Sequence, residues 1–136
     1  MRLIKQQKMQ QLLAEAAHSE RKRAHFLLHD SHQDKVQRLL IVLIQGSYVE
    51  PHYHELSHQW EMFVVMEGSI RITTFEATGK VKNSFLAGPE HEVSLVEFLP
   101  GEIHSVECLS EHAVMLEIKE GPFNIAYAKT FPDWKS

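Results

Sequence analysis

The sequence predicts an all-β fold, a small sandwich or barrel of short strands that follows a single N-terminal helix. Three observations lead to this prediction. Seven or so β-rich runs succeed one another at a spacing of about ten residues. Turns rich in Gly, Pro or polar residues separate these runs, whereas only residues 6–18 show helical spacing. Because 136 residues is an ordinary length for one domain, we expect residues 1–136 to form a single unit.

The N-terminal part, residues 1–35, is expected to contain one helix and an irregular segment. Residues 6–18 are rich in Gln, Ala, Glu and Lys, which favour helices. The apolar stripe of this helix consists of Leu12, Leu13, Ala16 and Ala17. Residues 19–35 are polar, so we expect a loop or short irregular structure there.

Residues 36–120 are expected to form the β-barrel. The predicted strands are 36–44, 61–66, 69–76, 81–86, 93–99, 104–109 and 113–119. The runs on either side of Glu67-Gly68 form a hairpin across a tight turn. In the last strand one face (Val114, Leu116, Ile118) is interpreted as core. Glu117 and Lys119 share the other face, which is either a solvent face or the lining of a pocket.

The remaining residues, 121–136, form an irregular tail. It carries aromatic side chains, so we expect it to pack back on the barrel. These aromatic residues are Phe123, Tyr127, Phe131 and Trp134.

Composition excludes several classes of function. The net charge of −4 and pI of about 6.2 leave no global basic field, so we expect no nucleic-acid partner. No apolar run reaches the ~18 residues that a membrane span needs, and the N-terminus lacks the apolar core of a signal peptide. The lone cysteine, Cys108, cannot form an internal disulfide. We therefore expect a cytoplasmic protein.

Histidine is unusually frequent, with ten copies, and three of them are placed as metal ligands would be. His52 and His54 are two residues apart, and in an extended chain such side chains point to the same face. Glu61 begins the next predicted strand, and His104 follows a Pro-Gly turn. Three imidazoles and one carboxylate suit one divalent transition metal, either Zn, Fe, Mn, Ni, Co or Cu.

The spacing of these residues resembles that of the cupin superfamily. Five residues separate Gly46 from His52, six separate His54 from Glu61, and six more separate Glu61 from Gly68. The segment PGEIH, residues 100–104, resembles the second cupin motif. The resemblance implies a double-stranded β-helix, the cupin jelly-roll barrel, with the metal held by His52, His54, Glu61 and His104.

Several further segments resemble the WbuC family of cupin-fold metalloproteins over nearly the whole chain. They are RKRAHFLLH at 21–29, VQRLLIVL at 36–43, WEMFVV at 60–65 and EIKEGPF at 117–123. The resemblance implies a role in surface-polysaccharide (O-antigen) metabolism, through a metal-dependent reaction on, or binding of, a sugar-derived small molecule. Two alternatives stay open. One is a non-catalytic ligand-binding or sensor module, and the other is an Fe or Cu dioxygenase.

Six other residues are candidates for contact with that ligand, namely His58, Cys108, Lys119, Arg23, His25 and His29. His58 lies in the loop between two proposed ligands, and Cys108 shares a strand face with His104. Besides the small molecule, a second copy of the chain is a candidate partner, because exposed sheet edges must be covered or blunted. The helix and the aromatic tail could also cover these edges, so the sequence leaves monomer and homodimer open.

Overall fold

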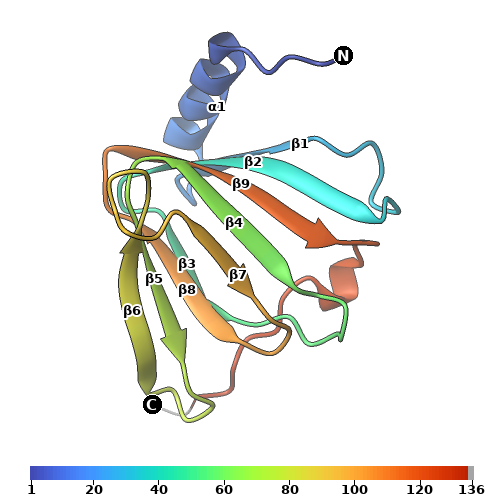
Figure 1. Cartoon of the computed structure of the whole chain (residues 1–136), viewed down its shortest axis with the longest axis vertical. Coiled ribbons are helices and arrows are strands. Elements are labelled where there is room, and N and C mark those ends of the chain that lie inside the picture. Colours follow the sequence, from blue (N-terminus) through green and yellow to red (C-terminus); the bar gives the residue numbers. More distant parts are fainter. Residues whose placement is uncertain (135–136) are drawn as a thin grey trace.

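The computed structural model describes residues 1–134, which form two antiparallel sheets that face each other below an N-terminal helix (Figure 1). The elements in chain order are α1 (Gln6–His18), β1 (Arg23–Leu27), β2 (Val36–Ile44), β3 (Tyr48–His52), β4 (Glu61–Glu67), β5 (Ile70–Phe75), β6 (Val81–Ala87), β7 (Leu95–Phe98), β8 (Ile103–Cys108), β9 (His112–Glu120) and the 3₁₀ turn η1 (Ile125–Tyr127). The all-β fold with one N-terminal helix is thereby confirmed.

The larger sheet has the order β1-β2-β9-β4-β7 and the smaller one has the order β3-β8-β5-β6. The hairpin predicted around Gly68 joins β4 of the larger sheet to β5 of the smaller one, so it connects the sheets rather than pairing the two strands. Inward-facing side chains of both sheets, among them Leu43, Phe63, Ile72 and Val106, form the main core.

Two strands lie where the sequence predicts none. Residues 19–35 include β1, the edge strand that pairs with β2, so the expectation of irregular structure is wrong there. The alternation that would reveal β1 is weak because Arg23 and His25 occupy its cavity-facing positions. The second strand, β3, ends at His52 and pairs with β8.

The larger sheet is apolar on both faces, so β9 contributes to two cores. Helix α1 covers part of the outer face, where Leu12 and Ala16 pack on Val42 and Val114. The inner face of β9 carries Met115 in the main core. Val114 is buried in the second core beneath the helix, so the prediction that its face of the strand belongs to a core is confirmed.

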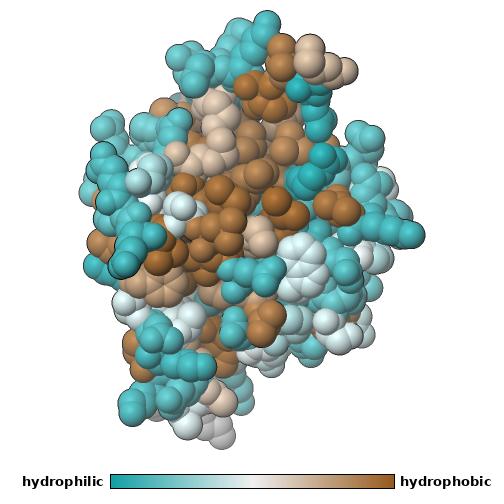
Figure 2. All heavy atoms as spheres, viewed as in Figure 1, coloured by the Kyte–Doolittle hydropathy of each residue, from teal (hydrophilic) through white to brown (hydrophobic). Residues whose placement is uncertain are grey.

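The part of this outer face that α1 does not cover is visible as an apolar area over β4 (Figure 2). Met66 and Leu95 are exposed there, on neighbouring strands. The described residues include no helix long and apolar enough to cross a membrane.

The C-terminal tail packs back on the barrel, as its aromatic content predicts. Tyr53 and Thr130 exchange backbone hydrogen bonds of 2.9 Å, and Nε1 of Trp134 donates to the carbonyl of Ala77. In Figure 1 the tail descends from η1 toward the end of the β5–β6 hairpin. It thereby borders the loop that follows His52.

Candidate metal centre

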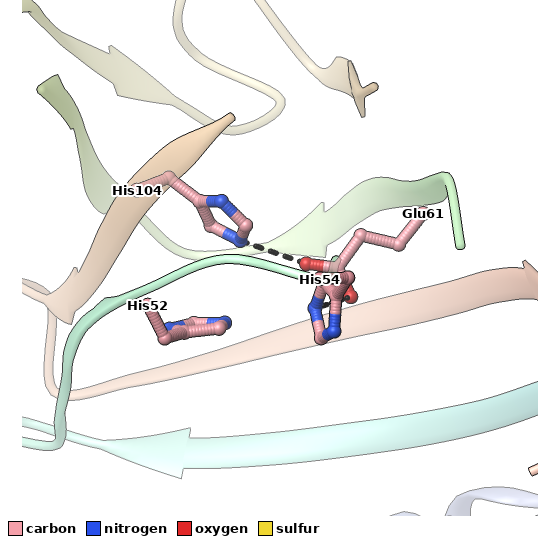
Figure 3. A group of neighbouring side chains, drawn as sticks. All are labelled: His52, His54, Glu61 and His104. Carbon is pink, nitrogen blue, oxygen red and sulfur yellow. Dashed lines mark hydrogen bonds and ion pairs between the residues drawn. The ribbon is translucent and has the colours of Figure 1, made fainter. Parts of the chain in front are cut away.

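Both sheets contribute to one buried group of four side chains, His52, His54, Glu61 and His104 (Figure 3). His52 ends β3 and lies opposite His104 of β8 in the strand register. His54 follows in the loop, and Glu61 begins β4. One ligand atom from each residue can be chosen so that all four lie within 4.8 Å of one another.

The ring nitrogens of two histidines are oriented by their own backbone. Nδ1 of His52 donates to the carbonyl of Glu50 at 2.8 Å, and Nδ1 of His104 donates to that of Glu102 at 2.9 Å. Because a carbonyl can only accept, Nδ1 carries the proton in both rings. Each Nε2 is then the atom available to a metal, which is the usual role of such backbone bonds.

The carboxylate of Glu61 joins two of these histidines. Nε2 of His104 lies 2.8 Å from Oε1, and Nε2 of His54 lies 3.1 Å from Oε2. Burial alone would raise the pKa of Glu61, but the bonds from His104 and His54 outweigh it and lower the pKa well below its usual value. Glu61 is therefore ionised, as a metal ligand must be.

The pKa values of His52 and His54 are shifted in opposite directions. Burial, helped by the charge of His104, lowers the pKa of His52 to about 4, so its ring is neutral at pH 7. Burial also opposes protonation of His54, yet contact with the Glu61 carboxylate raises the pKa of that ring. Nε2 of His54 is buried without a hydrogen bond of good geometry among the described residues.

These observations fit a divalent transition metal. Ligand atoms roughly 2.0–2.2 Å from one ion are at most about 4.4 Å apart, so the set has to contract only slightly from 4.8 Å. Nε2 of His54, which lacks a hydrogen bond of good geometry, and Nε2 of His104 both face the Glu61 carboxylate, so these side chains would hold the ion together with His52. Three nitrogens and one carboxylate oxygen do not select among Zn, Fe, Mn, Ni, Co and Cu.

A cavity of about 590 Å³ adjoins the group, within the usual range for small-molecule sites. His52, His54 and Glu61 line it. Its other walls come mainly from β1, β2, β9 and the tail. The apolar part of the lining includes Leu39, Ile41, Leu43, Val49, Phe63 and Met115.

The additional ligand-contact candidates divide between this cavity and other places. Arg23, His25, His29 and Lys119 line the cavity. Cys108 is instead part of the main core, where its thiol donates to the Ser110 carbonyl. Among the described residues the cavity lining does not include His58, which is half-buried in the loop after His54.

Other residues of the cavity have weaker sequence signals. Glu117 lines it beside Lys119, with Oε2 and Nζ 3.4 Å apart, so the pocket-lining interpretation of this pair fits the geometry. Lys129 also lines the cavity, but it lies in the tail, where no periodic pattern indicates which side chains turn inward.

Comparison with solved structures defines the fold. CapF from Staphylococcus aureus, described as a capsular polysaccharide assembling protein, matches with a TM-score of 0.68 at 17% identity, over 83% of this chain and 32% of CapF. A cupin superfamily protein from Desulfitobacterium hafniense DCB-2 matches with a TM-score of 0.56 at 18% identity, over 72% of this chain and 76% of its own. KdgF from Halomonas sp. matches with a TM-score of 0.56 at 10% identity, over 73% of this chain and 81% of KdgF.

The fold is thus that of the cupins, and the four-residue group is a candidate metal centre within it. At the level of the family, the chain belongs to the one described as Domain of unknown function (DUF6016), which matches residues 4–87. No curated protein matches the chain. The family match does not confirm the resemblance to the WbuC family, which stays a prediction.

Proposed function

We propose that the chain is a metal-dependent cupin that binds and transforms a small, sugar-derived molecule in surface-polysaccharide metabolism. The observation that carries this proposal is the buried group of His52, His54, Glu61 and His104 beside a cavity of about 590 Å³. The fold likeness to CapF and the sequence resemblance to the WbuC family support the choice of pathway.

Four protein ligands leave two positions of an octahedral ion open, and the ion would supply Lewis-acid polarisation of a hydroxyl or carbonyl there. The chain itself supplies a proton carrier. Burial, followed by the charge of Glu61, raises the pKa of Glu117 to about 7. Its carboxyl group, held near Lys119, is thus able to accept or release a proton near neutral pH.

The first test is the metal content of protein purified without a histidine tag. We expect one equivalent of a transition metal in the wild type and its loss in His104→Gln, because the fully buried Nε2 has no substitute. His18→Gln is the matched control, since His18 lies exposed at the end of α1. Metal-free wild type, or equal metal loss in both variants, would contradict the proposal.

The second test separates an enzyme from a binding module. The metal-loaded protein is incubated with nucleotide sugars and hexose phosphates, and products are followed by mass spectrometry. Turnover that His104→Gln abolishes supports an enzyme. Metal-dependent binding without any product would favour the non-catalytic module, and oxygen consumption by the iron-loaded protein would favour a dioxygenase.

A further inference from the structure

The cavity concentrates positive charge in a protein that is acidic as a whole. Four cationic side chains line it, namely Arg21, Arg23, Lys119 and Lys129, and we call them the cationic wall. The carboxylates in the same lining are Glu61 and Glu117. The chain as a whole carries a net charge of −4, so the excess of positive charge in the cavity lining is opposite in sign to the net charge.

Those two carboxylates are already engaged. Glu61 contacts His54 and His104 at 3.1 and 2.8 Å. Glu117 lies 3.4 Å from Lys119. Within residues 1–134, no ion pair within 4.0 Å involves the remaining three members of the wall, Arg21, Arg23 and Lys129. A divalent ion at the candidate centre would add still more positive charge.

The unpaired cations lie close enough to act on one another. Partial burial, followed by the charge of Arg21, lowers the pKa of Arg23. Half-buried Arg23 makes one long hydrogen bond in the described chain, from Nη1 to the Arg21 carbonyl at 3.4 Å. Most donors of its guanidinium are therefore free for a ligand.

We propose that the cationic wall selects a small oxyanion, a metabolite whose carboxylate or phosphate lies against Arg23 and Lys129 while another oxygen faces the candidate metal centre. A planar guanidinium binds either group through two parallel hydrogen bonds, and Lys129 adds a point charge. This inference deepens the proposed function, on which it rests, by naming the charge class of the substrate.

The apolar part of the lining limits the rest of the ligand. Leu39, Ile41 and Phe63 face the cavity and offer no polar group to further anionic or hydroxyl substituents. A polyanion would leave charges unpaired against these side chains, at a large desolvation cost. The wall and the apolar lining together therefore favour a ligand with one or two anionic groups.

The test measures the dissociation constants of malonate, inorganic phosphate and, as a neutral control, glucose by calorimetry at low ionic strength. Binding of malonate or phosphate is expected, with a Kd about tenfold or more higher in Arg23→Gln and in Lys129→Gln, because each variant removes a charge-assisted contact. Arg71→Gln is the matched control, since it removes the same charge from an exposed position on β5.

The inference is supported if malonate or phosphate binds and its Kd is higher in Arg23→Gln and Lys129→Gln. The anion that binds more tightly identifies carboxylate or phosphate as the preferred group. The inference is overturned if neither anion binds. It is also overturned if the Kd is equal in wild type, Lys129→Gln and Arg71→Gln. Lys129 lies in the tail and is exposed, so its variant tests the wall even where Arg23→Gln fails to fold.

The same titrations on metal-free protein separate this inference from the proposed function. Metal content decides the metal centre, whereas loss of anion binding in Lys129→Gln decides the wall. Anion binding by wild-type protein that contains no metal as purified would contradict the proposed function and leave the wall supported. Bound metal without binding of either anion would support the metal centre and overturn the cationic wall.

Discussion

The imidazole of His104 is held by contacts on several sides before any metal arrives. Its two nitrogens lie 2.9 Å from the Glu102 carbonyl and 2.8 Å from Glu61. The ring of Phe98 stacks on it with centroids 3.7 Å apart and planes inclined by 7°. A ring so fixed has little freedom to lose when an ion binds, which favours high affinity.

His25 provides a prediction about a single side chain. Its ring lines the cavity, where desolvation and then the charge of Arg23 lower its pKa to about 4, with smaller effects from Arg21, Lys129 and Lys119. An NMR titration should show a midpoint near 4. Arg23→Gln should raise this midpoint, whereas Arg71→Gln should not.

The sign of the effect on stability follows from the same shift. Between pH 4 and 6.5 the unfolded state binds more protons at His25 than the folded state. The free energy of unfolding therefore rises with pH across this window and falls as the pH drops through it. Denaturant unfolding of His25→Gln should show a smaller pH dependence there. An unchanged dependence would contradict the lowered pKa.

At the scale of elements, the parts of the site differ in how well the sequence predicts them. His52, His54 and Glu61 lie within ten residues, so a local motif reveals them, and the Pro-Gly turn adds His104. Strand β1 is harder to predict because cavity-facing polar residues weaken its alternation. The inner face of β9 is ambiguous because both faces of this strand are covered.

The turn at Gly68, between β4 and β5, gives a prediction about one element. Gly68 has φ of +79°, and a Cβ there would meet the backbone oxygen of His112. Gly101 has a similar φ of +86°, but a Cβ there would meet nothing within 4 Å. Gly68→Ala combines backbone strain with a clash, whereas Gly101→Ala has the strain alone.

Denaturant unfolding of the two variants separates these contributions. Gly101→Ala should lower the free energy of unfolding by about 1–2 kcal/mol. Gly68→Ala should lower it further, by about another 1–3 kcal/mol, as overpacking usually does. Equal decreases in the free energy of unfolding would mean that the β4–β5 turn accommodates the added methyl group without destabilisation.

For the whole molecule, the candidate centre links the two sheets. Ligands come from β3 and β8 in the smaller sheet and from β4 in the larger one. A bound ion should therefore stabilise the complete fold and not only one sheet.

The position of the uncovered apolar area over β4 was not predictable from the sequence, because it depends on where α1 packs.

Removal of the metal should accordingly lower the midpoint of thermal unfolding. At a free metal concentration a hundredfold above Kd, binding adds about 2.7 kcal/mol to the free energy of unfolding. For a domain of this size, chelation should lower Tm by about 5 °C or more. Scanning calorimetry with and without EDTA provides the measurement. Glu61→Gln should respond little, and an equal response would place the metal elsewhere.

The proposed oxyanion contacts and the candidate metal ligands come from different parts of the chain. Arg21 and Arg23 enter with the edge strand β1, and Lys129 enters with the tail, whereas the four metal-ligand candidates lie on or next to β3, β4 and β8. Substitutions in the two peripheral segments leave the metal-binding side chains in place. The ligand preference can therefore be changed at positions 21, 23 and 129 without substitution of a candidate metal ligand.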